Sequence, residues 1–291
     1  MKILHRILAA AILLFLCSCT EKQEQKQIGL QLYSIRAQMA KNMDTTLDAV
    51  AAAGYSFVEL AGYNHKEGTF YGLPGQDFIR LCHSRGLEVL SSHINGPDPN
   101  TIPWEACLSW WDKAIEDHAQ AEIKYLVQPS MHKTAYTSLE GLLQYCRLFN
   151  EVGEKCNNAG IRFGYHNHDK EFSTLFDGIP IYDHMLLHTN PDNVFFQIDV
   201  FWSLVGGSPA QEYMEKYPGR FELWHVKDDK EIGASGTIDF ESLYKRARIA
   251  GLKYAIVEQE AFDLEPFESI KASYDFLNNA PYVKPSYAPV P

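Results

Sequence analysis

The amino-acid sequence is poor in positive charge. Its 26 lysine and arginine residues stand against 37 aspartate and glutamate residues, so the formal net charge at pH 7 is −11. A protein that binds nucleic acid or an anionic membrane through its surface field needs the opposite balance. The composition therefore disfavours a nucleic-acid partner, and it suits a neutral small molecule or a cation held by carboxylates.

Long hydrophobic runs are absent after the first 18 residues. The one extended apolar run, residues 7–16, follows two basic residues and is too short for a comfortable transmembrane helix. This pattern is typical of a secretory signal peptide. The motif Leu16-Cys17-Ser18-Cys19 resembles a bacterial lipobox, which implies cleavage before Cys19 and lipid attachment to that residue. An ordinary secretory signal that ends near Ser18 is the alternative.

The lipobox predicts an extracytoplasmic lipoprotein that faces the periplasm or the cell surface and meets the membrane only through its lipid anchor. Loss of residues 1–18, which carry two basic and no acidic residues, would change the net charge to −13. Residues 19–27 would then form a polar tether. We expect one folded domain over residues 28–280 and a proline-rich tail over residues 281–291.

Cysteine motifs are missing as well. The cysteines after residue 19 form no CxxC pair, and none lies near a histidine at zinc-finger spacing. They are Cys82, Cys107, Cys146 and Cys156. We expect four small buried side chains. A disulfide is permitted outside the cytoplasm, but the spacing does not indicate one.

The chain does contain eight short apolar or β-branched runs, which predict strands. They cover residues 28–34, 56–62, 87–93, 124–130, 161–168, 194–200, 221–228 and 253–260. Amphipathic helices are expected between them, among others over residues 43–53, 138–159 and 239–250, with Ser138 and Asp239 as N-caps.

This alternation of strands and helices over about 250 residues predicts a single α/β domain with the (β/α)8 TIM-barrel fold. The competing fold is an open doubly wound sheet. Such a sheet usually carries a glycine-rich phosphate loop after its first strand, and "LYSIRAQ" has none.

Polar side chains fall at the end of every expected strand, which is where the active site of a TIM barrel lies. In chain order they are Gln31, Glu59, His93, Gln128, His166 with His168, Asp199, His225 with Lys227, and Glu258 with Glu260. Inward-facing residues of a strand share parity. His166 and His168 therefore share one face, as do Gln197 and Asp199.

A metal ion would explain three of these residues together. Asp199 lies inside the apolar run "FFQIDVFW" and Glu258 inside "YAIVEQE", so both carboxylates need a partner to offset their desolvation. With His225 between them in the sequence, one divalent cation would satisfy both. Imidazole and carboxylate ligands together suit Mn, Co, Zn or Fe better than Ca.

The strand ends "YHNHDKEF", "QIDVFW", "WHVKD" and "IVEQE", in this order, resemble those of the xylose-isomerase-like sugar phosphate isomerase/epimerase superfamily. The resemblance covers essentially residues 28–280 and implies a (β/α)8 barrel with one divalent metal. Carried over to this sequence, Asp199, His225 and Glu258 match the family's ligands on strands six to eight. Many members have Glu where this chain has His166, so His166 inherits the fourth position with one negative charge fewer.

The resemblance implies a carbohydrate enzyme that removes a proton next to a sugar carbonyl. The missing fifth-strand carboxylate weakens the epimerase assignment, unless His168 or Glu171 replaces it as base. We therefore favour β-elimination or hydration on a 3-keto-glycoside, with isomerisation or epimerisation of a free keto sugar as the alternative. A non-catalytic sugar-binding lipoprotein is a second alternative. The export signal and the charge disfavour a DNA-repair endonuclease of the same superfamily.

Role assignments follow from position along the strands. His168 is expected as base or substrate ligand, and His93 and Glu59 as acid/base partners from the opposite wall. Lys227 would neutralise enolate charge, unless it is a rim lysine paired with Asp228. Substrate contacts are expected from five residues, with Trp202 stacking on a sugar face. These five are Gln31, Gln128, Trp202, Asp228 and Glu260.

Overall fold

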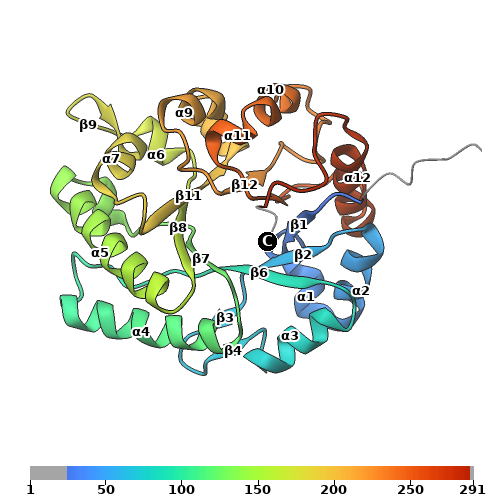
Figure 1. The fold of residues 1–291 in the computed structure, drawn as a ribbon, viewed down its shortest axis with the longest axis horizontal. Coiled ribbons are helices and arrows are strands. Elements are labelled where there is room, and N and C mark those ends of the chain that lie inside the picture. Colours follow the sequence, from blue (N-terminus) through green and yellow to red (C-terminus); the bar gives the residue numbers. More distant parts are fainter. Residues whose placement is uncertain (1–24, 289–291) are drawn as a thin grey trace, which may run out of the picture.

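The computed structural model describes residues 25–288. Eight parallel strands close into a barrel in the order β1-β13-β12-β11-β8-β7-β6-β2, and Figure 1 shows helices surrounding them. The barrel strands are β1 (Ile28–Gln31), β2 (Phe57–Leu60), β6 (Glu88–His93), β7 (Tyr125–Gln128), β8 (Arg162–His166), β11 (Val194–Asp199), β12 (Leu223–Val226) and β13 (Tyr254–Val257). The expected (β/α)8 fold is confirmed, with one strand inside each of the eight expected ranges.

Helices of different lengths cover the outside of the barrel. They are α1 (Arg36–Lys41), α2 (Met43–Ala53), α3 (Gly75–His83), α4 (Trp104–Gln120), α5 (Leu139–Asn158), α6 (Lys170–Ser173), α7 (Ile181–His188), α8 (Val200–Val205), α9 (Ala210–Lys216), α10 (Phe240–Lys245), α11 (Ala247–Ala250) and α12 (Pro266–Asn279), with 3₁₀ turns η1 (Leu32–Ile35) and η2 (Lys133–Tyr136). Within residues 25–288, no helix is both long and apolar enough to cross a bilayer.

Two small antiparallel sheets in the loops were not expected from the sequence. One consists of β3 (Tyr63–Asn64), β4 (Thr69–Phe70) and β5 (Leu73–Pro74), and the other of β9 (Leu175–Phe176) and β10 (Ile179–Pro180). The helix expected over residues 239–250 is also different, because it is divided into α10 and α11 at Arg246. The Arg246 guanidinium donates to the Ser242 carbonyl at 3.0 Å, and the Arg246 N–H bonds to Leu243 O instead.

The interior of the barrel has an apolar floor. The residues that fill it are Phe57, Leu90, Tyr125, Val127, Phe195, Leu223 and Ile256. Gly164 makes room in this layer, since a β-carbon there would lie 2.5 Å from the Phe195 ring. Two residues further along several strands, the inward side chain becomes polar, as from Phe57 to Glu59 and from Leu223 to His225. Strand alternation therefore places a polar layer directly above the apolar one.

A second, larger core lies between the barrel and its helices. Trp111 of α4 and Phe149 of α5 pack edge-on or tilted against Phe163 of β8. The four cysteines are buried and free, as expected. Burial in these apolar surroundings raises the pKa of Cys146 to about 12, which keeps that thiol protonated and unreactive.

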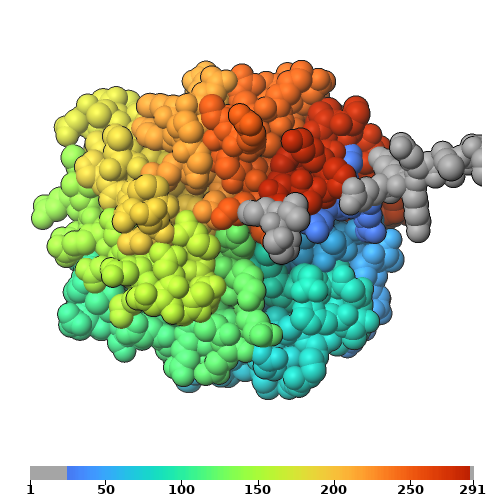
Figure 2. All heavy atoms as spheres, in the orientation of Figure 1, coloured from blue at the N-terminus to red at the C-terminus, as the bar shows by residue number. Residues whose placement is uncertain are grey.

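The two ends of the described chain meet at the floor end of the barrel, ahead of β1. The Gln27 amide donates to Pro285 O at 2.8 Å, and the Lys26 ammonium donates to Leu277 O at 3.2 Å. Figure 2 shows the C-terminal segment, in red, beside the first described residues, in blue. Cys19 and the predicted signal peptide lie outside the described residues.

Candidate metal centre and active site

Four side chains from neighbouring strands meet at the polar end of the barrel. They are His166 at the end of β8, Asp199 at the end of β11, His225 on β12 and Glu258 directly after β13. Each offers one ligand atom, these atoms lie within 4.8 Å of one another, and all four residues are buried. The register explains this gathering, because Asp199 pairs with His225 and Gln197 pairs with His166 in the parallel ladder.

This group has two buried atoms that lack a hydrogen-bond partner in residues 25–288. They are Oδ2 of Asp199 and Nδ1 of His166. The other carboxylate oxygen, Asp199 Oδ1, accepts the N–H groups of Phe201 and Trp202 at 2.9 and 2.8 Å. Leaving a buried acceptor unpaired costs about 1–3 kcal/mol. A divalent cation would coordinate both unpaired atoms, so the residues fit the metal that the sequence motifs imply.

The charges of the group point in the same direction. Burial raises the pKa of Asp199 to about 7, with Lys227 opposing the shift and Glu258 adding to it. Burial, followed by the repulsion of His225, lowers the pKa of His166 well below its usual range. His166 is therefore a neutral imidazole, which is the form that binds metal. The raised pKa of Asp199 means that nearby positive charge does not offset the burial of its carboxylate, and a bound cation would supply that charge.

His225 and Glu258 form an ion pair beside these two residues. Burial lowers the pKa of His225, but the carboxylates of Glu59 and Glu258 outweigh burial and raise it to about 10. Burial likewise favours neutral Glu258, yet the charge of His225 lowers its pKa to about 2. Nδ1 of His225 lies 3.3 Å from Oε2 of Glu258. A bound cation would replace the proton between these two atoms.

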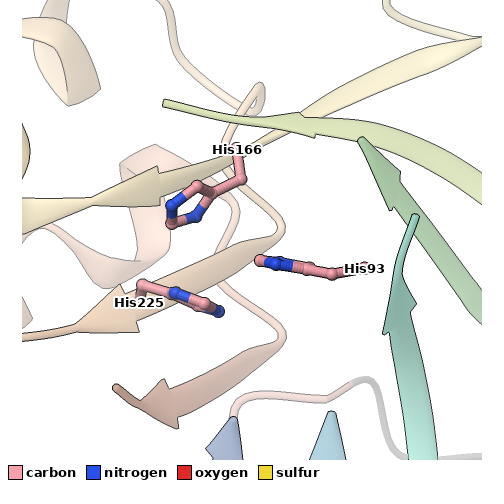
Figure 3. Close-up of side chains that lie close together, drawn as sticks. All are labelled: His93, His166 and His225. Carbon is pink, nitrogen blue, oxygen red and sulfur yellow. The ribbon is translucent and has the colours of Figure 1, made fainter. Parts of the chain in front are cut away.

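A pocket of about 340 Å³ opens above the group, within the usual range for small-molecule sites. It is lined by Tyr33, Ala61, His93, Asn95, Pro129, Ser130, His166, His168, Trp202, Glu258 and Glu260. Six of these residues were expected at the site from the sequence. Figure 3 shows the rings of His93, His166 and His225 facing one another.

Lys227 is buried beside the pocket. Its ammonium lies 3.3 Å from Oε1 of Glu260 and about 5.7–5.8 Å from the ring centres of Trp202 and Phe201. Its ion-pair partner is therefore Glu260 and not Asp228. The Asp228 carboxylate instead accepts the N–H groups of Asp229 and Gly233 at 2.8 and 3.0 Å, which shapes the loop after β12. Asp228 is not among the pocket-lining residues.

Three other expected residues lie outside the pocket lining. Glu59 and Gln31 are fully buried and hydrogen-bonded to each other at 2.8 Å. Burial raises the pKa of Glu59, but His93 and His225 outweigh it and hold that pKa well below its usual range. The Gln128 amide donates to Ser130 O at 2.7 Å. Glu171, the alternative base, accepts from the Tyr165 hydroxyl and the His168 N–H, so its carboxylate is occupied.

Amide side chains at the site were missed by sequence reasoning. The Gln197 side chain lies between His93 and Glu59. Asn167 joins the ends of β8 and β11, since it accepts from Asp199 N at 3.1 Å and donates to Asp199 O at 3.3 Å. The inward parity of Gln197 was the available signal. An amide carries no mark of metal or acid/base chemistry, so parity alone did not assign it a role.

The chain is similar to known proteins along most of its length. A family model described as xylose isomerase-like TIM barrel matches residues 47–280. A sugar phosphate isomerase/epimerase from Parabacteroides distasonis ATCC 8503 is 34% identical with a TM-score of 0.80, covering 89% of this chain and 100% of that chain. A second protein of that description and organism is 32% identical with a TM-score of 0.84, covering 91% and 98%.

More distant structures share the fold alone. A D-psicose 3-epimerase from Clostridium cellulolyticum H10 is 12% identical with a TM-score of 0.66, covering 88% of this chain and 99% of that chain. No curated protein matches the chain. From the family match and the two relatives above 30% identity, we conclude that the chain belongs to the xylose isomerase-like TIM barrel family.

Proposed function

We propose that this protein is a divalent-metal-dependent carbohydrate enzyme that removes a proton next to a sugar carbonyl. The observation that carries the proposal is the buried group of His166, Asp199, His225 and Glu258, with two unpaired ligand atoms at the base of a pocket. When bound there, Mn, Co, Zn or Fe supplies positive charge that stabilises the anion formed by proton loss.

The chain's own residues supply the remaining functions. His93 at the end of β6 and His168, two residues after β8, line the pocket and would take a proton from the carbon beside the carbonyl. The Trp202 ring offers an aromatic surface at the rim for a sugar face. The Lys227 ammonium, held by Glu260, directs positive charge towards the same space. Proton transfer and charge stabilisation are thus available in one cavity.

Elimination on a 3-keto-glycoside is the outcome that we favour. A base takes the C2 proton beside the C3 ketone, the electron pair of that C–H bond forms a C1=C2 double bond, and the glycosidic C1–O bond breaks so that the aglycone leaves and takes up a proton. The described residues that line the pocket include no arginine or lysine, and the Lys227 ammonium beside it is already paired with Glu260, which argues against a phosphorylated sugar. An imidazole at position 166 also removes the carboxylate that an epimerase-like site would use there.

Isomerisation or epimerisation of a keto sugar is the second proposal. The names of the two relatives above 30% identity support it, since both are sugar phosphate isomerase/epimerases. The same first step serves this reaction, because reprotonation of the anion at either carbon or on the other face gives an isomer or an epimer.

We also propose that the protein is a lipoprotein, with the lipid on Cys19. Support comes from the sequence of the first 19 residues. An extracytoplasmic enzyme would meet oxidised glycosides more readily than sugar phosphates, which is consistent with elimination as the favoured reaction.

The test is to incubate the metal-loaded protein with a 3-keto-glucoside and, separately, with free keto sugars in heavy water, and to follow both by NMR. Release of the aglycone with a 2-hydroxy-glycal product is expected, and Asp199→Asn should abolish it. Deuterium incorporation with a new epimer or aldose would instead establish the isomerase. Tight sugar binding without either signal would overturn the enzyme proposal in favour of a capture protein.

A further inference from the structure

The Glu59 carboxylate lies at the centre of the polar layer and is surrounded by hydrogen-bond donors. Gln31 Nε2 donates to Oε1 at 2.8 Å, and Gln197 Nε2 donates to Oε2 at 2.8 Å. The Ser91 hydroxyl also donates to Oε2. Glu59 is fully buried. A carboxylate that only accepts dictates which atom of each neighbour must face it.

The first consequence concerns His225. Its Nε2 lies 2.6 Å from Glu59 Oε1 and must therefore carry a proton. The orientation of the Gln31 amide is fixed in the same way. Its Oε1 accepts the Tyr33 N–H at 3.0 Å, so its amide nitrogen is the atom that faces Glu59. The nitrogen of His225 that remains for a metal is Nδ1, on the side of Glu258.

The second consequence concerns His93. Because Gln197 directs its amide nitrogen at Glu59, its oxygen faces His93, and Gln197 Oε1 lies 2.6 Å from His93 Nε2. The same nitrogen lies 3.0 Å from Glu59 Oε1. Two acceptors thus hold the proton on Nε2 of His93. In the neutral ring, Nδ1 is therefore bare, which means that it carries no proton and can accept one. His93 lines the pocket, so this nitrogen is available to a substrate.

The imidazoles of His225 and His93 lie stacked, with ring centres 5.1 Å apart and planes 14° apart, as Figure 3 shows. Oε1 of Glu59 lies within 3.0 Å of Nε2 in both rings. We infer that Glu59, with Gln197 as its relay, is a positioning residue that fixes the tautomers of His225 and His93 and thereby presents one bare nitrogen to the metal and one to the substrate. This inference rests on the proposed function for the roles of metal ligand and base, but the tautomers themselves do not.

The direct test is ¹⁵N NMR of the histidine side chains in the zinc-loaded protein without substrate. Protons on Nε2 of both His225 and His93 are expected. A proton on Nδ1 of His225, or His93 as an Nδ1–H tautomer, would overturn the inference. This measurement needs no variant, so it stands even if a substitution of Glu59 prevents folding.

Zinc affinity, measured by competition with a chelator, provides a second test. Glu59→Gln should weaken zinc binding about 10- to 100-fold, as loss of a carboxylate partner to a ligating histidine does elsewhere. The matched control is Ser91→Ala, which removes one hydrogen bond to Glu59 without touching an imidazole; it should change affinity less than about threefold. Equal affinity of Glu59→Gln and wild type would contradict the inference.

Gln197→Met separates the two histidines. It removes the nearer of the two acceptors of His93 Nε2, leaves Glu59 Oε1 at 3.0 Å as the other, and keeps the contact between Glu59 and His225. Zinc affinity should stay within about threefold of wild type, while the ¹⁵N spectrum of His93 becomes a tautomer mixture. An unchanged His93 signal would contradict the relay role. Absence of sugar turnover in wild type would instead count against the proposed function and leave the tautomer result standing.

Discussion

At the scale of single residues, the imidazole of His166 sets the charge of the metal group. Two carboxylates, Asp199 and Glu258, and two imidazoles form the group. With both imidazoles neutral, two negative charges balance a divalent cation. A glutamate at position 166, which the resemblance makes usual, would leave the loaded group negative. With a divalent cation bound, the neutral group would retain more of the cation's power to draw electrons from a carbonyl.

The buried His118 predicts a pH dependence of stability at a distance from this group. His118 lies in α4 and packs edge-on against the rings of Tyr63 and Phe70, and burial lowers its pKa to about 4. The unfolded chain, with a pKa of about 6.5, binds more protons between these values, so stability falls as the pH falls through this window. Wild type should lose about 2–3 kcal/mol more than His118→Gln between pH 7.5 and 4.5, measured by urea unfolding. Parallel curves for the two proteins would contradict this.

At the scale of elements, the strands were the most predictable part of the chain. Their apolar runs gave their positions, and strand alternation placed His225 and Asp199 in one layer. Several strands are shorter than expected, because side chains at their ends accept hydrogen bonds from the backbone N–H groups that follow and start a turn or helix there. Gln31 is an example: its side chain caps the turn η1 and ends β1 three residues before the expected limit.

The role of Glu59 could not be predicted from the sequence. Its contacts reach His225, which is 166 residues away, and Gln197, which is 138 residues away. A strand-end glutamate is compatible with a solvated rim position, an acid/base role or a buried acceptor. Only the closure of the barrel decides among these, because it surrounds the carboxylate with donors.

Helix α5 depends on its N-cap. Ser138 accepts the Gly141 N–H at 3.1 Å, and α5 packs Phe149 against Tyr165 of β8, the strand that carries His166. Ser138→Ala should reduce the free energy of unfolding by about 1 kcal/mol, measured by urea titration. Ser138→Asp should stay within about 0.5 kcal/mol of wild type, since aspartate also caps. A loss of equal size in both variants would show that packing and not capping is responsible.

At the scale of the whole molecule, the fold and the position of the site were predicted together. Parallel strands bring their ends to one face of the barrel, so polar residues scattered from position 31 to 260 had to converge. The distribution of residues between the metal group, the pocket lining and the supporting layer was not predictable. It depends on side-chain pairing across the barrel, as with Lys227, which pairs with Glu260.

Metal binding should stabilise the entire barrel, because the four residues lie on, or directly after, four neighbouring barrel strands. At a metal concentration about 100 times Kd, binding adds about 2.7 kcal/mol. For a chain of this size that corresponds to a rise in Tm of about 5–10 °C. Differential scanning calorimetry with and without a chelator measures it. In Asp199→Asn, the Tm with and without the chelator should be the same. If the chelator does not change the Tm of wild type, the metal site is contradicted.

The meeting of the chain ends at the floor of the barrel has a practical consequence. Residues 25–27 and 285–288 lie at the opposite end of the strands from the pocket. An affinity tag, a fusion partner or a surface linker joined directly to residue 25 or to residue 288 would therefore start on the far side from the substrate entrance. Immobilising a chain that begins at residue 25 through that residue should leave the entrance open to the bulk solution.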